Sequence, residues 1–318
     1  MKTTETGARK GASLRPSKLG SKRQGSNGRL ARANDRALFL MIVPAIIMYA
    51  VFYLYPTLSN LRYAFSEWDG LQEAKFIGTK NFTRALTNDD IFYKVLGNNI
   101  EFTGLVVIFQ TGLSLLFAIF LLKNTRTSVA LRTLYFFPTI ISSVSVAMVW
   151  QFLYEPNLGP INTFLNSVGL DFLALNWLGS ETVTLRAIAF TQVWFHTGQM
   201  MVVYIAGLQQ IPQELYEAAE VDGASRWQQF KSVTWPMALP TTAVVMAYTT
   251  IQSFRAFDLV YAMTQGGPNN SSSILVTLIY LTAFNELRFG YAATQSIYLV
   301  IFILALTALQ RRILRTRY

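Results

Sequence analysis

The chain has 318 residues, of which 52% are hydrophobic and only 14% are charged, whereas a soluble domain carries about 25% charged residues. Cysteine is absent and histidine occurs once, at His196, which excludes disulfides, thiolate metal sites and cysteine nucleophiles. The net charge of +10 does not indicate a nucleic-acid partner, because ten of the 27 basic residues lie within residues 1–36. The composition is typical of a membrane protein.

Residues 1–36 are rich in Ser, Gly and Arg and show no apolar periodicity, which predicts a disordered basic cytoplasmic tail. A cleaved signal peptide would have a short apolar region and a small-residue cleavage site. A long apolar stretch ending at Tyr55 follows instead, so we expect the first helix to stay in the protein. The alternative is an organelle transit peptide, which is also basic and Ser-rich.

Six apolar blocks have the length of about 20 residues that crosses a bilayer as a helix: 37–55, 99–122, 134–153, 185–208, 237–257 and 291–309. A proline inside the third block, Pro138, is expected to kink its span. A seventh apolar run, Ile274 to Phe284, has about half the required length and is expected to be interfacial or re-entrant.

The distribution of basic residues supports six spans. With six, both termini share one side of the membrane, and 19 of the 27 basic residues then lie in the cytoplasm. The sequence therefore predicts an all-α integral membrane protein with six transmembrane helices and both termini cytoplasmic. Residues 37–311 would form the transmembrane domain, and residues 312–318 a second basic cytoplasmic tail.

Between the fourth and fifth spans, the cytoplasmic stretch 211–236 is predicted to form two short helices joined by a turn at Asp222-Gly223. Pro212 suits a first helical position, because proline lacks the N–H that is left unpaired there. Gly223 suits the residue just after a helix, because glycine tolerates positive φ.

The second helix of this loop has its own start and stop signals. Ser225 and Gln228 have the spacing of a capping box, and Pro236 is expected to stop the helix. Three of its side chains fall near one face, Trp227, Phe230 and Thr234. An ordered cytoplasmic loop that displays aromatic side chains predicts a protein partner.

This loop resembles the EAA loop of binding-protein-dependent ABC permeases. The matching residues are Glu217-Ala218-Ala219, Gly223 four residues later, Val233 ten residues after the glycine, and Pro236 three residues after that. Val233 and Trp235 stand where the family has Ile and Leu.

The resemblance implies the ABC type I importer permease architecture and a coupling helix that docks in a cleft of an ATPase subunit. The docking residues would be Glu217, Ala218, Ala219, Asp222, Gly223, Trp227 and Phe230. The alternative is a solvated helical hairpin.

Other stretches are similar to the first permease of maltose, glycerol-3-phosphate and lactose-type systems. They include Tyr63-Ala64-Phe65, Phe257-Asp258-Leu259-Val260-Tyr261, Gly266-Gly267-Pro268 and Gly290-Tyr291-Ala292-Ala293. Taken alone, the Gly-Gly-Pro segment could be a surface turn. Together they imply that this chain takes part in the uptake of a carbohydrate across the bacterial inner membrane and carries out no chemistry of its own. The implied partners are an extracytoplasmic solute-binding protein, a second homologous permease, two ATPase subunits and membrane lipids.

Polar side chains inside the spans are candidates for substrate contact, because they are costly unless they face a protein interior or a watery cavity. The fourth span offers Gln192, His196 and Gln199 on one face, and the fifth offers Thr249, Gln252 and Ser253. By similarity to the maltose permease, the sugar would rest between these two helices, where Trp194 or Tyr248 could stack on it. The alternative is interhelical hydrogen bonding, worth about 0.6 kcal/mol per bond.

Rival classes of protein require features that we do not find in the sequence. No Gly-x-x-x-x-Gly-Lys-Ser/Thr loop occurs, so we expect ATP and Mg²⁺ on the partner ATPase subunits and no cofactor, metal or catalytic residue on this chain. A membrane enzyme would need convergent titratable groups, and an ion-coupled transporter a charged residue at mid-span. Arg255 and Asp258 lie near the outer end of the fifth span and are expected to pair. Import of an amino acid, peptide or polyamine by the same machinery is the alternative function.

Overall fold

The structure is a computed structural model that describes residues 40–314, so the tail predicted at 1–36 lies outside the described residues. The chain forms two units, one up to Ser59 and one from Asn60 onward. Apart from two short strands, the secondary structure of the described residues is helical.

The first helix runs from Leu40 to Ala64 and so continues beyond the end predicted at Tyr55. It contains a π-helical segment, η1 (Ala50–Leu54), followed by α2 (Tyr55–Ala64). Pro56 follows this segment after one intervening residue, Tyr55. In an α-helix the proline ring crowds the carbonyl four residues earlier, and the wider π turn relieves that crowding.

A small hairpin and a short helix follow. Strand β1 (Ser66–Glu67) pairs antiparallel with β2 (Lys75–Phe76), and α3 (Lys80–Thr87) comes next. The Asn81 amide of α3 donates to the carbonyls of Ala64 and Ser66, at 3.2 and 2.9 Å. The hairpin is therefore tied to α3 through one buried side chain.

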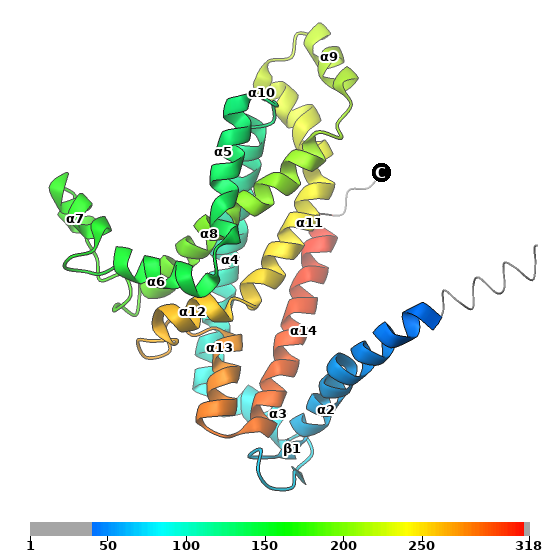
Figure 1. Ribbon diagram of the computed structural model, residues 1–318, viewed down its shortest axis with the longest axis vertical. Coiled ribbons are helices and arrows are strands. Elements are labelled where there is room, and N and C mark those ends of the chain that lie inside the picture. The colour runs from blue at the N-terminus through cyan, green and yellow to red at the C-terminus, as the bar shows by residue number, and fades with distance from the viewer. Residues whose placement is uncertain (1–39, 315–318) are drawn as a thin grey trace, which may run out of the picture. The chain divides into compact units, whose positions relative to one another are not determined.

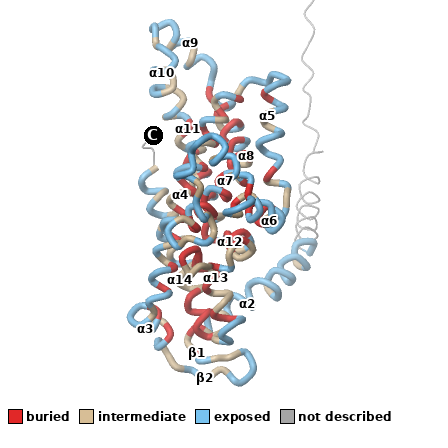
Figure 2. Tube along the Cα trace, turned by 90° about the vertical axis from the view of Figure 1, so that its left-hand side faces the viewer, coloured by how far each residue is buried: buried red, intermediate tan, exposed pale blue. Residues whose placement is uncertain are grey.

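Four long helices make up most of the second unit: α4 (Asp90–Phe120), α8 (Thr184–Leu208), α11 (Trp235–Phe254) and α14 (Phe289–Ile313). Helix α4 packs along α8 and α11, and α11 also packs along α14 (Figure 1). Figure 2 shows that the buried residues concentrate along these helices and the short helix α13 (Leu275–Tyr280). Helix α4 starts well before the predicted Asn99, because Asp89 caps it by accepting from the Phe92 N–H at 2.8 Å.

The block predicted as one span at 134–153 is broken. Helix α5 (Arg126–Phe136) passes through a 3₁₀ turn, η2 (Phe137–Ile140), and helix α6 (Ser143–Leu153) leaves at 99°. Pro138 lies in the 3₁₀ turn, and Ser142 has the extended backbone of a helix N-cap. A proline followed by a new cap ends one helix and starts another, which explains a break where only a kink was expected.

Helix α8 approaches α5 closely at one glycine. A Cβ atom at Gly198 would lie 1.9 Å from the Tyr135 carbonyl oxygen, so only glycine allows the two backbones to pack there. This contact lies just before the 3₁₀ turn and sets the position of the break relative to α8.

The remaining helical segments are short: α7 (Pro160–Ser167), η3 (Asp171–Leu173), α9 (Gln213–Val221), α10 (Arg226–Gln229), η4 (Phe230–Thr234), α12 (Phe257–Thr264) and η5 (Leu281–Asn285). Segments α13 and η5 together form the apolar helix Leu275–Asn285, which is too short to count as a membrane span. It coincides with the apolar run that was predicted to be interfacial or re-entrant.

Within residues 40–314, three helices are long and apolar enough to cross a membrane, Leu40–Ala64, Asp90–Phe120 and Phe289–Ile313, and the bent pair α5–α6 would make a fourth. Helices α8 and α11 have 25 and 20 residues but are not apolar enough to meet this criterion. The chain is thus a multi-pass, all-helical membrane protein, and two of its long helices are more polar than the others.

Candidate functional site

Helices α8 and α11 carry two features that the sequence singles out. The loop that joins them, residues 209–234, is here called the elbow and lies at one end of the bundle (Figure 1). Between the two helices, further along the bundle, lies a cavity that is here called the polar pocket. The same pair of helices therefore connects a surface feature to an internal one.

The first half of the elbow is α9 with its terminal turn. Pro212 is the N-cap of α9 and not its first helical residue as predicted, because the helix begins at Gln213. Gly223 has φ of +75°, a left-handed conformation that favours glycine, and its N–H bonds to the Glu220 carbonyl at 3.0 Å. Glu217 and Ala218 are exposed on α9, and Ala219 is half-buried.

The second half of the elbow begins with the predicted capping box. The Ser225 hydroxyl accepts from the Gln228 N–H at 3.4 Å, and the Gln228 side chain accepts from the Ser225 N–H at 2.7 Å. Pro236 does not stop this helix, contrary to expectation. Instead α10 passes through the π-helical η4 directly into α11, where Pro236 lies in the first turn. As with η1 and Pro56, a π turn ends two positions before the proline and gives its ring room.

Aromatic side chains run along the elbow. The rings of Trp227 and Phe230 stack with centroids 5.4 Å apart, and Phe230 lies 6.5 Å from Trp235 of α11. Trp227 is 70% exposed. Thr234 instead turns inward, with its hydroxyl 3.1 Å from that of Tyr216. Trp227 is therefore exposed on the surface of the elbow, while Thr234 links α9 to the start of α11.

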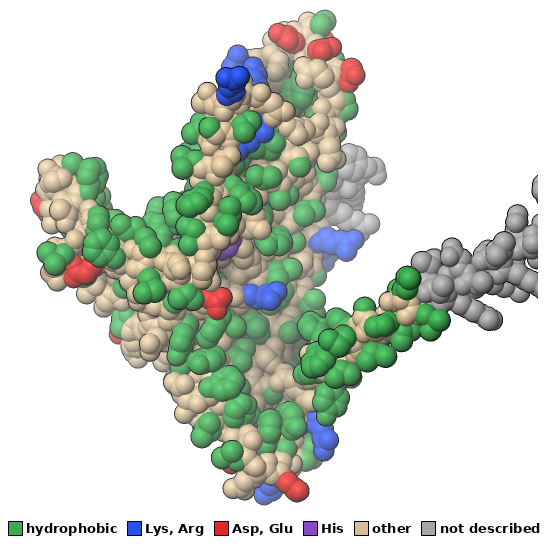
Figure 3. All heavy atoms as spheres, in the orientation of Figure 1, with side chains coloured by type: hydrophobic (Ala, Val, Ile, Leu, Met, Phe, Trp, Pro, Cys, Tyr) green, Lys and Arg blue, Asp and Glu red, His purple; other side chains and the backbone are tan. Residues whose placement is uncertain are grey.

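Figure 3 shows that acidic side chains gather over α9 at the tip of the elbow. They are Glu214, Glu217, Glu220 and Asp222, and all four are exposed. A tip with this charge suits a basic surface on a partner.

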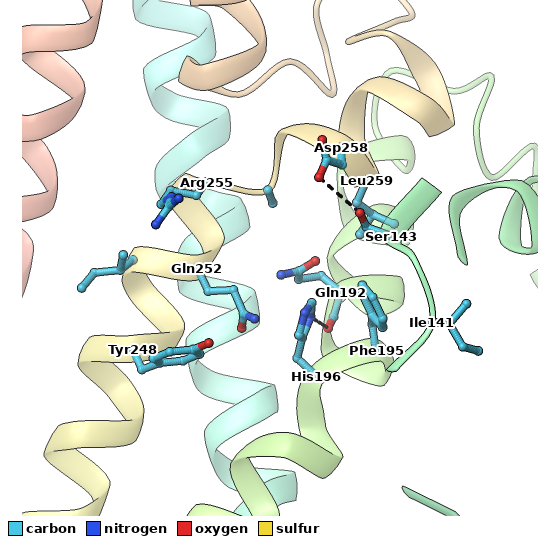
Figure 4. Close-up of a pocket in the computed structure, with 12 residues that line it drawn as sticks. Ile141, Ser143, Gln192, Phe195, His196, Tyr248, Gln252, Arg255, Asp258 and Leu259 are labelled. Atoms are coloured by element: carbon cyan, nitrogen blue, oxygen red, sulfur yellow. Dashed lines mark hydrogen bonds between the residues drawn. The ribbon is translucent and has the colours of Figure 1, made fainter. Parts of the chain in front are cut away.

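The polar pocket has a volume of about 390 Å³ (Figure 4). Helix α8 contributes Gln192, Phe195 and His196, and α11 with its C-terminal cap contributes Tyr248, Ile251, Gln252, Arg255 and Ala256. The rest of the lining comes from Ile141 and Ser143 at the α5–α6 break and from Asp258 and Leu259 of α12.

Three of the six candidate path residues line this pocket: Gln192, His196 and Gln252. Gln199 lies outside the lining, and its amide donates to the Tyr248 hydroxyl at 3.3 Å. It therefore reaches the pocket through Tyr248.

Thr249 and Ser253 lie elsewhere. Both are fully buried, and Thr249 accepts from the Gln110 amide of α4 at 3.3 Å, while the Ser253 hydroxyl donates to the Thr249 carbonyl at 2.8 Å. Tyr248 and Gln252 are four residues apart and share the pocket face, so their successors share the face toward α4. Trp194 also lies outside the pocket lining and packs edge-on against Trp150, with centroids 5.4 Å apart.

The predicted pairing of Arg255 with Asp258 is not found among the described residues. The Asp258 carboxylate accepts from the Ser143 hydroxyl at 3.3 Å, and Figure 4 shows Arg255 on the other side of the pocket. The chain turns at Ala256 between α11 and α12, so the two residues do not share a continuous helix. Both charged groups therefore face the pocket.

Unused hydrogen-bonding capacity also points into the pocket. The Gln252 side-chain oxygen is buried and has no partner among residues 40–314. The His196 Nδ1 atom lies 3.4 Å from the Gln192 carbonyl, and its Nε2 atom makes no hydrogen bond within the part of the chain that the structure describes, so it is available to a solute. Amide, imidazole, hydroxyl and charged groups around one cavity can bind a polar solute rich in hydroxyls.

Sequence reasoning missed six lining residues: Ile141, Ser143, Phe195, Ile251, Ala256 and Leu259. The first two enter because the third apolar block breaks at this level. Pro138 followed by Ser142 was the available signal, because a proline and a capping residue four positions later are typical of a helix end and a new start.

Comparison with known proteins defines the class. Residues 110–317 match the family of binding-protein-dependent transport system inner membrane components. Over 87% of its length, the chain is 33% identical to the probable ABC transporter permease protein YurN of Bacillus subtilis, covering 96% of that protein. It is 32% identical to the trehalose/maltose transport system permease protein MalF of Thermococcus litoralis, over 85% of this chain and 90% of that protein.

The fold is also similar to a chain of a bacterial ABC transporter involved in the import of the acidic polysaccharide alginate. The TM-score is 0.78 at 25% identity, and the match covers 90% of this chain and 98% of the other. The chain is therefore a transport subunit and not an enzyme. It belongs to the family of binding-protein-dependent transport system inner membrane components.

Proposed function

We propose that the chain is the permease subunit of a bacterial ABC importer and forms half of the translocation path for a carbohydrate, such as an oligosaccharide or a sugar derivative. The observation that carries this proposal is the extent of its likeness to sugar permeases. That likeness covers 85% of the chain for the trehalose/maltose permease and 90% for the alginate transporter. It supports a sugar over an amino acid, peptide or polyamine.

In this proposal the protein lies in the inner membrane with six spans and both termini in the cytoplasm. The distribution of basic residues supports this orientation. Helices α8 and α11 would be the fourth and fifth spans, although they are less apolar than the others. Their polar side chains line a pocket or pack inside the bundle, so a lipid environment does not oppose them.

The elbow would dock on one of two ATPase subunits, which bind ATP and Mg²⁺ and supply the energy of transport. A second homologous permease would complete the path. The contact residues would be Glu217, Ala218, Ala219, Asp222, Gly223, Trp227 and Phe230. Two small alanines allow close approach, and the exposed Trp227 offers a large apolar surface.

The continuity of the helices supports mechanical coupling. Helix α8 ends at Leu208, and only residues 209–212 separate it from α9. At the other end of the elbow, α10 continues through η4 into α11 without a break. A displacement of the elbow by the ATPase would therefore move both helices that line the polar pocket.

In the pocket, Gln192, His196 and Gln252 would bond sugar hydroxyls, and the exposed ring of Tyr248 could stack on a pyranose face. Gln199 would orient Tyr248 through their hydrogen bond. Thr249 and Ser253 would support the pocket from behind through the contact with α4.

The test is reconstitution of the complete importer, with both permeases, both ATPases and the binding protein, in liposomes. We expect the binding protein loaded with a sugar from a panel of oligosaccharides to stimulate ATP hydrolysis and sugar uptake. We also expect protease to cut at Asp222-Gly223 only from the cytoplasmic side. Stimulation by amino acids or peptides alone, or cleavage from outside, would overturn the proposal.

A further inference from the structure

A second large cavity lies at the end of the bundle opposite the elbow, where Figure 1 shows β1 and α3. Its volume is about 730 Å³. It is formed by the β1–β2 hairpin, α3 and the residues that begin α14. This cavity lies far from the polar pocket along the chain and shares none of its lining residues.

Three basic side chains line this cavity: Lys80, Arg84 and Arg288. The Arg288 Nη1 atom donates to Glu286 at 2.9 Å, but its Nη2 atom is buried and has no partner in the described part of the chain. Among residues 40–314, neither Lys80 nor Arg84 forms an ion pair. Lys80 and Arg84 are exposed, so water can solvate them, but a buried charged donor such as the Arg288 Nη2 atom is costly without an acceptor. That atom therefore indicates an acceptor that comes from outside the described residues, and the two exposed cations add positive charge beside it.

A tyrosine holds the two guanidinium groups in place. The Arg84 and Arg288 groups lie 5.0 and 4.9 Å from the centre of the Tyr291 ring, within the range of a cation–π contact. The Tyr291 hydroxyl in turn donates to the Asp89 carboxylate at 2.5 Å. The ring is thereby anchored, and both guanidinium groups are pre-positioned beside the cavity.

Most of the nearby acidic groups are already engaged by the chain itself. The Asp69 carboxylate accepts from the Leu71 and Gln72 N–H groups, at 3.0 Å each, and these bonds, that of Gln72 foremost, lower the pKa of Asp69. The Asp89 carboxylate accepts from the Phe92 N–H. The N-terminus of the long helix α14 adds a partial positive charge at the same place. The donors that remain free in this cavity therefore favour an anion.

We propose that this cavity receives an aspartate or glutamate side chain of the extracytoplasmic solute-binding protein. The inference rests on the proposed function, which places this end of the bundle outside the cell. A guanidinium group presents two parallel N–H donors that match the two oxygens of a carboxylate. The cavity lining also includes Glu67 and Asp69, whose negative charges disfavour a broad anionic surface such as a lipid leaflet more than a single carboxylate placed beside the basic groups.

The test uses the complete importer in lipid nanodiscs, titrated with its sugar-loaded binding protein while ATP hydrolysis is followed. We expect Arg84→Gln and Lys80→Gln to raise the half-saturating concentration of binding protein about tenfold, and to weaken its dependence on salt. Maximal stimulation and basal hydrolysis should stay unchanged. The matched control is Lys75→Gln, an exposed lysine of β2 that does not line the cavity, which should shift the value less than about twofold.

Two results would overturn this inference. In one, both cavity variants behave like Lys75→Gln. In the other, their effect appears only in nanodiscs that contain anionic lipid, which would assign the cavity to a lipid headgroup. A wild-type importer that its binding protein does not stimulate at all would instead contradict the proposed function, so the two failures are distinguishable.

Discussion

The elbow and the polar pocket lie on the same two helices but are built in different ways. The elbow is stabilised by hydrogen bonds between residues that are close in sequence, such as Ser225 with Gln228 and Tyr216 with Thr234. The pocket needs Ser143 beside Asp258, which are 115 positions apart in the chain. Local signals therefore suffice to predict the conformation of the elbow, whereas the lining of the polar pocket depends on how distant segments pack.

They also differ in what they leave unsatisfied. The elbow exposes a large apolar ring, that of Trp227. The pocket instead contains a buried polar atom, the Gln252 side-chain oxygen, that has no partner among the residues the structure describes. An exposed aromatic ring is stabilised by contact with another protein, and an unpaired buried oxygen by a donor from a solute. Substitutions in the two regions should therefore have separable effects.

The largest effect on stability is expected where α8 packs against α5, because α8 carries part of the pocket and leads into the elbow. Gly198→Ala places a Cβ atom against the Tyr135 backbone and should destabilise the protein by about 1–3 kcal/mol or more. Thermal unfolding of the purified protein measures this. The control is Gly104→Ala in α4, where a Cβ atom meets nothing within 4 Å and stability should hold or rise. Equal melting temperatures for the two variants would contradict the close approach of α8 to α5.

At the elbow, Glu217→Lys should strongly weaken docking of the ATPase and leave membrane insertion intact, because it reverses a charge at the exposed tip. Co-purification with a tagged ATPase subunit measures the docking. Glu73→Lys makes the same change at an exposed residue between β1 and β2 and should have no effect. If the Glu217→Lys complex assembles and couples normally, the role assigned to Glu217 is wrong.

Two substitutions in α11 should distinguish residues that line the pocket from residues that pack behind it. Gln252→Ala should lower sugar uptake about tenfold at unchanged stability, because it removes a polar group from the pocket. Thr249→Val should instead lower stability and leave uptake unchanged. The Gln110 amide loses its acceptor at a cost of about 1 kcal/mol, and the pocket lining stays the same. Uptake and melting temperature are measured on both variants. Unchanged uptake with Gln252→Ala would return that residue to a structural role.

Gln199→Ala should also lower uptake, by a smaller factor and without a change in assembly. Its amide acts on the pocket only through the Tyr248 hydroxyl, at 3.3 Å. Tyr248→Phe removes the same hydrogen bond and keeps the ring, so it should reproduce the effect. A variant of Gln199 that transports normally would show that Tyr248 needs no such support.

The smallest effect is expected at the capping box. Ser225→Ala removes one bond of the box and should cost about 1 kcal/mol of local helix stability. Hydrogen exchange at the Gln228 N–H should speed up, and Ser225→Asp, which keeps a capping oxygen, should restore its protection. Unchanged exchange with Ser225→Ala would mean that the contacts of Phe230 and Trp235 alone hold α10.

The sequence alone determined the features that depend on short-range chemistry. Helix α8 begins within one residue of its predicted start, and the glycine turn at Gly223 and the capping box at Ser225 occur as expected. These features follow from caps, positive φ and apolar length, which act over a few residues. The EAA spacing belongs to the same kind of signal, and the family match to residues 110–317 agrees with it.

Only the tertiary structure decided which polar residues face the pocket. From the sequence, Thr249 and Gln252 were equal candidates, and the direction of each side chain became clear only once α4 was placed beside α11. Likewise, Arg255 and Asp258 have the spacing of a pair, but the turn at Ala256 separates them. A side chain's exposure to a cavity depends on helix rotation against distant neighbours, and residue spacing carries no information about that rotation.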